Sequence, residues 1–146
     1  MDVAHRRENA IRRLFAEGLK CCPDFLQNFN GNVLGVYGDP AGLAKADILD
    51  CKNEKDIEKC LKLKYLVGYT VLVLLNVIEH CQKDLSKILK KELKNLEDDL
   101  LFKLRILDNM KCPQNCEDIL KIFDELINNY ILDEKNNFIL EQCCNK

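Results

Sequence analysis

Cysteine is the residue type in this sequence with the most varied chemistry. The 146 residues include nine cysteines, namely Cys21, Cys22, Cys51, Cys60, Cys81, Cys112, Cys116, Cys143 and Cys144. Cysteine side chains can form disulfides, bind a metal ion or stay as buried thiols. No Cys-x-x-Cys knuckle occurs, and the closest pair that is not adjacent is Cys112 and Cys116. This spacing favours disulfides, or buried thiols in a cytosolic protein, over a zinc site or a redox enzyme.

Other nucleophiles and bases are scarce. The chain has one serine, Ser86, one threonine, Thr70, and two histidines, His5 and His80. Thr70 lies in an apolar segment and Ser86 in a lysine-rich one, so neither hydroxyl is placed beside an activating base. His80 precedes Cys81, but adjacent residues on a helix point about 100° apart. We therefore expect no enzyme activity, no bound metal and no cofactor.

The glycine-rich segment is the part of the sequence that reads most clearly as irregular backbone. Four of the six glycines lie between positions 31 and 42. Their spacing matches neither a phosphate-binding loop nor a dinucleotide fingerprint. The segment also carries the apolar residues Leu34, Val36 and Tyr37, which should not all face water. They either pack inward as a structural loop or border a ligand or partner site, and Tyr37 is the first residue to test because its hydroxyl can reach a polar group.

Four of the five arginines lie within the first 13 residues. A solvated helix face is one interpretation of this cluster. The other is an anion patch formed by Arg6, Arg12 and Arg13, because guanidinium forks bind phosphate, sulfate and acidic groups well.

Hydrophobic periodicity predicts an all-α fold, a compact bundle of five to six helices in a single domain spanning residues 1–146. The expected helices cover residues 3–19, 40–49, 53–82, 84–109, 115–130 and 134–144. Within the third, residues 65–80 are so apolar that this segment should form the centre of the bundle, wrapped by the others. Its apolar run is shorter than the roughly 20 residues that a membrane span needs, so we expect no span.

This arrangement also places the cysteines. If the two long helices are antiparallel, Cys81 lies at one end of the bundle and is expected to be a free thiol. Cys112 lies at the other end, about 40 Å away at a rise of 1.5 Å per residue. The cysteines expected to pair at that end are Cys51, Cys60, Cys112, Cys116, Cys143 and Cys144, joined by Cys21 and Cys22 if the first helix points the same way. The connectivity stays open among the 105 ways to pair eight cysteines.

Composition bounds the function. Hydrophobic residues make up 47% of the chain and charged residues 32%, with a net charge of -2, which argues against a nucleic-acid partner. The first 20 residues lack a signal-peptide core, so the sequence is either cytoplasmic or a mature chain without its leader. The cysteines favour a secreted, non-enzymatic binding protein for a small apolar ligand or a protein partner. The alternative is an intracellular helical adaptor or host-pathway antagonist that binds a partner helix in a groove.

Overall fold

The computed structural model describes residues 3–21, 44–45, 47–51, 56–80, 89 and 91–141. Its regular elements are the helices α1 (Val3–Cys21), α4 (Ile57–His80), α6 (Leu93–Asp108) and α7 (Cys116–Leu126), and the π-helical turn η1 (Ile127–Ile131). Within these ranges the only β-type pairing is an isolated antiparallel bridge between Leu132 and Phe138. The predicted all-α class is confirmed. The predicted number of helices is not, because the described residues form four α-helices instead of five to six.

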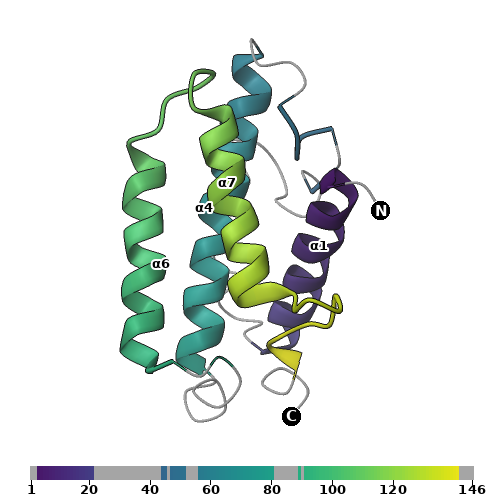
Figure 1. Cartoon of the computed structure of the whole chain (residues 1–146), viewed down its shortest axis with the longest axis vertical. Helices are drawn as coiled ribbons and strands as arrows, with labels where there is room; N and C mark the ends of the chain where they lie inside the picture. The colour runs from purple at the N-terminus through teal and green to yellow at the C-terminus, as the bar shows by residue number, and fades with distance from the viewer. Residues whose placement is uncertain are drawn as a thin grey trace.

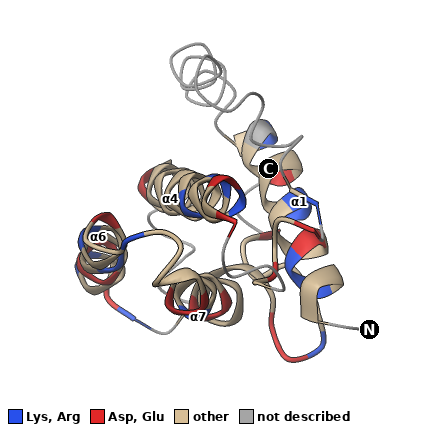
Figure 2. Cartoon of the chain, turned by 90° about the horizontal axis from the view of Figure 1, so that it is seen from above, with Lys and Arg blue, Asp and Glu red and all other residues tan. Residues whose placement is uncertain are grey.

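The four helices lie side by side in a bundle (Figure 1). Helix α4 packs against α1, α6 and α7, and η1 packs against α1. Figure 2 shows that α1 and α6 lie on opposite sides of the central pair formed by α4 and α7. Helices α1, α4 and α7 run in one direction, and α6 runs in the other.

Helix α4 is the core helix, as predicted. Its buried residues are Cys60, Leu63, Leu66, Val67, Tyr69, Thr70, Val71, Val73, Leu74, Val77 and Ile78. At 3.6 residues per turn they cover somewhat more than half of its circumference. Leu72 and Leu75 stay partly exposed, so the expected wrapping on every side is incomplete. The helix is long and apolar enough to cross a membrane by length and composition, and 56% of its most apolar window is buried inside the protein.

Two helix starts follow local signals. Asp56 precedes α4, and its Oδ1 accepts a hydrogen bond from the backbone N–H of Lys59 at 3.1 Å, which satisfies one of the unpaired donors of the first turn. Asn115 is the N-cap residue of α7, although its side chain makes no capping hydrogen bond to the backbone of the first turn. Its side chain accepts from the backbone N–H of Lys111 at 2.8 Å and donates to Asp118 at 3.1 Å. The cap of α7 therefore ties the preceding turn to the helix.

The helix predicted over 84–109 differs in the structure. Helix α6 begins only at Leu93, after Glu92, whose backbone is extended with ψ at 140°. No proline or glycine stands near this break. Once in the helix, Leu96, Leu100 and Leu107 are buried in the core. Leu89, before the break, is itself helical, and no local sequence signal marks the start of α6.

The helix predicted over 40–49 is also wrong where the structure describes it. Residues 44–45 and 47–51 form turns, in which the backbone N–H groups of Ile48 and Leu49 both donate to the carbonyl of Lys45. The side chain of Leu49 is fully buried. Its carbonyl oxygen accepts a hydrogen bond from the Arg7 guanidinium at 2.8 Å. One α-helical hydrogen bond, from Leu49 to Lys45, is therefore kept, and the contact with Arg7 joins this turn to α1.

The first part of the last predicted helix, 134–144, is replaced by a turn over 133–137, whereas Glu141 is helical. Oδ1 of Asp133 accepts hydrogen bonds from the backbone N–H groups of Lys135 at 2.8 Å and Asn137 at 2.9 Å. Asn136 has φ of 64°, in the left-handed region that asparagine tolerates. Because the aspartate side chain satisfies these donors locally, the backbone turns back instead of continuing as a helix. Positions 142–144 lie outside the described residues.

Two substitutions in α4 should change stability in opposite directions. Leu74 is fully buried, so Leu74→Ala should lower the free energy of unfolding by about 2–5 kcal/mol. A Cβ added at Gly68 would lie 3.6 Å from Leu107 Cδ2, an ordinary contact, so Gly68→Ala should raise it by about 1 kcal/mol. Urea unfolding of both variants measures this. A loss at Gly68→Ala would mean that α4 and α6 pack more closely than described.

Candidate functional site

Several predicted site residues lie outside the described residues. These are Leu34, Val36 and Tyr37 of the glycine-rich segment, and Cys22, Cys81, Cys143 and Cys144. The loop site and the free thiol at Cys81 therefore stay predictions. The described residues provide three other features, which are a disulfide-linked end, an arginine face on α1 and an apolar face on α6.

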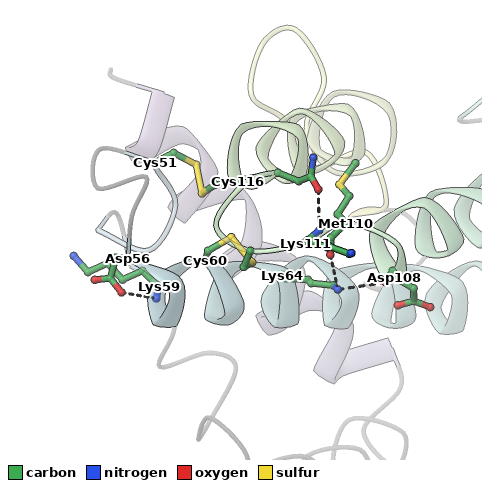
Figure 3. Close-up of a disulfide and its surroundings, with 11 residues drawn as sticks. Cys51, Asp56, Lys59, Cys60, Lys64, Asp108, Met110, Lys111 and Cys116 are labelled. Carbon is green, nitrogen blue, oxygen red and sulfur yellow. Dashed lines mark hydrogen bonds between the residues drawn. A yellow bond between two sulfur atoms is a disulfide. The ribbon is translucent and has the colours of Figure 1, made fainter.

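Two disulfides join the end of the bundle at which α4 and α7 begin (Figure 3). They link Cys51 to Cys116, with a Cα–Cα distance of 6.2 Å, and Cys60 to Cys112, with a Cα–Cα distance of 5.6 Å. The predicted convergence of these four cysteines is confirmed, and their connectivity is now assigned.

Cys21 is also disulfide-bonded. Helix α1 runs in the same direction as α4, so Cys21, its last residue, lies away from the end at which α4 begins (Figure 1). The condition under which Cys21 would join the other cysteines is therefore not met.

The same end holds a lysine bridge between helices. Lys64 of α4 donates from Nζ to the carbonyl oxygens of Asp108 at 3.4 Å and Met110 at 2.8 Å (Figure 3). The carbonyl groups at the end of a helix lack backbone partners and carry a partial negative charge. The ammonium group therefore fixes the end of α6 to the first half of α4.

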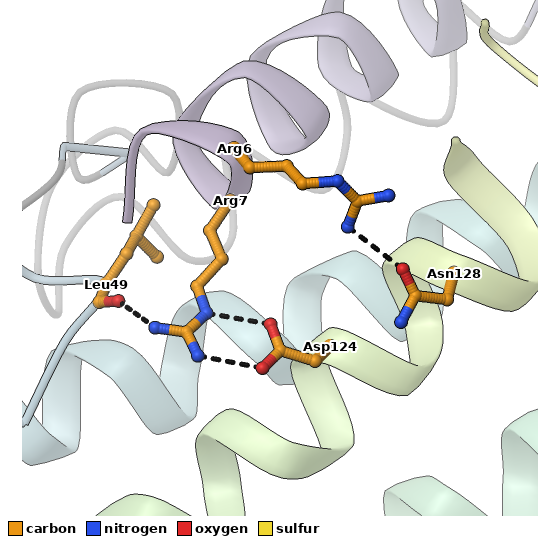
Figure 4. Close-up of polar contacts among 5 residues, drawn as sticks. All are labelled: Arg6, Arg7, Leu49, Asp124 and Asn128. Atoms are coloured by element: carbon orange, nitrogen blue, oxygen red, sulfur yellow. Dashed lines mark hydrogen bonds and ion pairs between the residues drawn. The ribbon is translucent and has the colours of Figure 1, made fainter. Parts of the chain in front are cut away.

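Arg7 connects three parts of the chain (Figure 4). Its Nε and NH2 groups donate to the two carboxylate oxygens of Asp124, both at 2.7 Å, and NH1 donates to the carbonyl of Leu49. The arginine side chain is only 12% exposed. This two-pronged ion pair holds α1 to α7 and to the turn that carries Cys51.

The role of Arg7 was not predicted from the sequence, although the opposite net charges of α1 and α7 indicate that these helices pair. Helix α1 contains five Lys and Arg residues against two acids, and α7 contains four acids against one lysine. Figure 2 shows these charged positions on the two helices. Opposite net charges on two amphipathic helices favour their association in a bundle.

A cleft of about 440 Å³ opens beside the Arg7 ion pair. Its lining residues are Arg7, Asp50, Cys51, Glu117, Leu120, Lys121 and Asp124. Most of them are charged and of mixed sign, so the cleft suits a polar group better than the small apolar ligand predicted from the sequence. Among the residues that the structure describes, no group of His, Cys, Asp and Glu could hold a metal ion.

The three arginines of the predicted anion patch do not point together. Arg12 forms an ion pair with Glu8 at 3.2 Å, and its Nε donates to the carbonyl of Ala44 at 3.0 Å. It is therefore partly neutralised and directed toward the 44–51 turns.

Arg6 and Arg13 instead meet at the turn after η1. Arg6 donates from NH1 to Oδ1 of Asn128 at 2.9 Å and from Nε to Oδ1 of Asn136 at 3.2 Å. Arg13 donates to the backbone carbonyl of Asn136 at 3.2 Å, and its guanidinium carbon lies 5.5 Å from the centre of the Phe138 ring. Both guanidinium groups thus contact the same residue, Asn136.

A hydrogen-bonded cluster fixes α6 against η1. The Tyr130 hydroxyl donates to Asp99 at 2.6 Å, and Lys103 bonds the other oxygen of Asp99 at 2.9 Å. Burial, and then the hydrogen bond to Asp99, raise the pKa of Tyr130 well above its usual value. Burial acts to raise the pKa of Asp99, but hydrogen bonds from Tyr130 and Lys103 outweigh it and hold that pKa below 3.8. The tyrosine therefore stays a donor and the aspartate a charged acceptor.

The outer surface of α6 carries large apolar side chains. Leu101, Phe102 and Ile106 are 47%, 57% and 37% exposed. Phe102 and Ile106 are four residues apart and share one face of the helix. Leu101 lies about 100° around the axis from Phe102, and the exposed residues Asp98 and Arg105 stand between them. The buried residues Leu96, Leu100 and Leu107 form a stripe on another side of α6. The positions of the exposed apolar residues outside this stripe were the sequence signal for an outer apolar surface. We call Phe102 and Ile106 the α6 apolar face.

No known family, curated protein or solved structure matches the chain significantly. The function is therefore inferred from the residues and their geometry.

The loop closed by Cys60 and Cys112 lies within the loop closed by Cys51 and Cys116. This arrangement predicts how much each disulfide adds to the free energy of unfolding when the other is present. The two disulfides span 65 and 52 residues, and when one is intact, the other closes only the short segments 51–60 and 112–116. Because closure entropy grows with loop length, Cys51→Ser with Cys116→Ser should lower the free energy of unfolding by only about 3 kcal/mol. Removing both pairs should lower it by more than twice that amount. Urea unfolding of the two variants that lack one disulfide each, and of the variant that lacks both, tests this. Equal losses for the two single pairs that add up to the loss for both would contradict it.

Tyr130→Phe should destabilise the protein by about 1–2 kcal/mol near neutral pH, because Asp99 loses its hydroxyl donor. The folded-state pKa of Asp99 is lowered, so its contribution is present above pH 3.8 and is lost as pH falls through the folded-state pKa. The difference from the wild type should therefore shrink in acid. Unfolding free energies across this range measure it. In an Asp99→Asn background the effect of Tyr130→Phe should not depend on pH, and a pH-dependent effect there would assign the titration to another group.

Proposed function

We propose that this chain is a non-enzymatic binding protein that acts on a protein partner in an oxidising, extracellular compartment. The observation that carries the proposal is the α6 apolar face. Large apolar side chains scattered singly on a surface are common, but Phe102 and Ile106 lie one turn apart on the same face of one helix. A helix with apolar residues on both faces can bury one in its own core and offer the other to a partner.

The contacts around α6 support this use. Helix α6 packs on α4 and α7 at one side of the bundle, so its other side carries no helix among the described elements (Figure 2). The Tyr130, Asp99 and Lys103 cluster fixes its rotation. A fixed surface loses less conformational freedom on binding than a mobile one, which favours affinity.

The disulfides support the compartment. Two intrachain pairs at bonding distance are compatible with an oxidising, extracellular environment. Both stabilise the end of the bundle at which α4 and α7 begin, and they leave Phe102 and Ile106 exposed.

Photo-crosslinking tests the partner surface with a control of equal exposure. Phe102 is 57% exposed on α6, and Val3 is 58% exposed on α1. A benzophenone amino acid at position 102 should form a discrete protein adduct in the fluid surrounding the producing cells, and excess unlabelled protein should compete it away. The same group at position 3 should form none. Equal adducts at both positions, or none at either, would contradict the proposal.

The thiol state decides the compartment. Protein taken from its natural source, alkylated before unfolding, should show the peptides of Cys51 with Cys116 and of Cys60 with Cys112 still linked. Fully alkylated thiols would instead favour the intracellular helical adaptor or host-pathway antagonist.

A further inference from the structure

A second surface on the opposite side of the bundle from α6 has the chemistry of an anion site. A pocket of about 200 Å³ is lined by Arg6, Asn9, Arg13, Leu132 and Asn136. Arg6, Asn9 and Arg13 are spaced by three and four residues on α1, so they share one helix face. The other wall is the turn after η1.

The two arginines in this pocket differ from the other arginines of α1 in their partners. Within the described residues neither forms an ion pair, in contrast to Arg7 and Arg12. Their partners are amide and carbonyl oxygens and an aromatic ring. The pocket lining therefore carries two positive charges and no carboxylate.

Nearby acids are already engaged elsewhere. Glu17, one turn beyond Arg13, pairs with Lys20 at 3.4 Å. Asp133 directs one oxygen to two backbone N–H groups of its own turn, which also hold its pKa below the usual value. Neither acid lines the pocket.

Unused donors point to a ligand with several acceptors. A guanidinium has five N–H groups. Arg6 uses two of them and Arg13 one in the hydrogen bonds described. Asn136 holds both groups in place, because its side chain accepts from Arg6 and its carbonyl from Arg13. Most N–H groups of the two guanidinium groups are therefore not used in these hydrogen bonds, and Asn136 fixes the position of both groups.

We infer that this pocket binds a phosphate or sulfate group that carries two negative charges. Such a group matches the two unpaired cations and supplies three or more acceptor oxygens, whereas a carboxylate brings one charge and two oxygens. The site consists of Arg6, Asn9, Arg13 and Asn136, and it differs from the predicted patch by excluding Arg12. It does not depend on the proposed partner surface of α6.

Nuclear magnetic resonance titration tests the site directly. Inorganic phosphate or sulfate, added at constant ionic strength, should shift the Nε–H signals of Arg6 and Arg13 and the amide signals of Asn9 and Asn136. Acetate at equal concentration should bind more weakly. Equal shifts with acetate or chloride would show general screening and would overturn the assignment.

Variants separate the site from the general charge of α1. Arg6→Gln with Arg13→Gln should weaken phosphate binding by about tenfold or more, while Arg12→Gln on the same helix should leave it unchanged. Arg13→Lys keeps the charge but loses the fork, so binding should weaken with the fold preserved. An equal loss in Arg12→Gln, or no loss in Arg13→Lys and the double variant, would overturn the site.

Titration with phenyl phosphate tells whether the pocket binds free phosphate or a phosphate ester on a larger molecule. Binding at least as strong as that of inorganic phosphate shows that the pocket accepts an ester on a larger molecule. Weaker binding shows that it closes over the free anion. Either result, with the Arg6 and Arg13 dependence above, supports the site, and binding of phenyl phosphate that ignores both arginines contradicts it.

Discussion

Burial of α4 is the constraint on which the other contacts depend. A helix with apolar residues over more than half of its circumference is stable in water only when neighbours cover that surface. Helices α1, α6 and α7 supply the cover, and each presents its own apolar stripe to α4. Because those stripes face inward, the arginines of α1, the acids of α7 and the outer residues of α6 are left to interact with one another or with other molecules.

Polar contacts then choose one arrangement among the many that would bury the same apolar area. The Arg7 and Asp124 ion pair sets α1 against α7, and Lys64 sets the end of α6 against α4. Disulfides fix the same end of α4 to α7 and to the turn beside α1. These polar contacts and disulfides thus hold the scaffold that carries the two surfaces proposed for binding.

The sequence was enough to predict α1, α4 and α7, because α1 and α7 have clear apolar stripes and α4 has a long, almost wholly apolar segment. The predicted helix lengths were enough to place Cys51, Cys60, Cys112 and Cys116 at the same end of the bundle. The sequence could not predict where α6 begins, since no breaker residue marks Glu92. Nor could it predict that Arg7 pairs with Asp124, 117 positions away. The turn at 133–137 did carry a signal, an aspartate followed by two asparagines, which periodicity outweighed.

The π-helical turn η1 makes the molecule sensitive to chain length at one point. The Leu132 N–H donates to the carbonyl of Ile127, five residues back, so this turn holds one residue more than an α-helical turn would. Deleting a residue there would restore a regular helix and rotate everything beyond it by about 100°. Tyr130 would leave Asp99, and Asn136 would leave Arg6 and Arg13. Relatives of this protein should therefore keep the number of residues between positions 127 and 131.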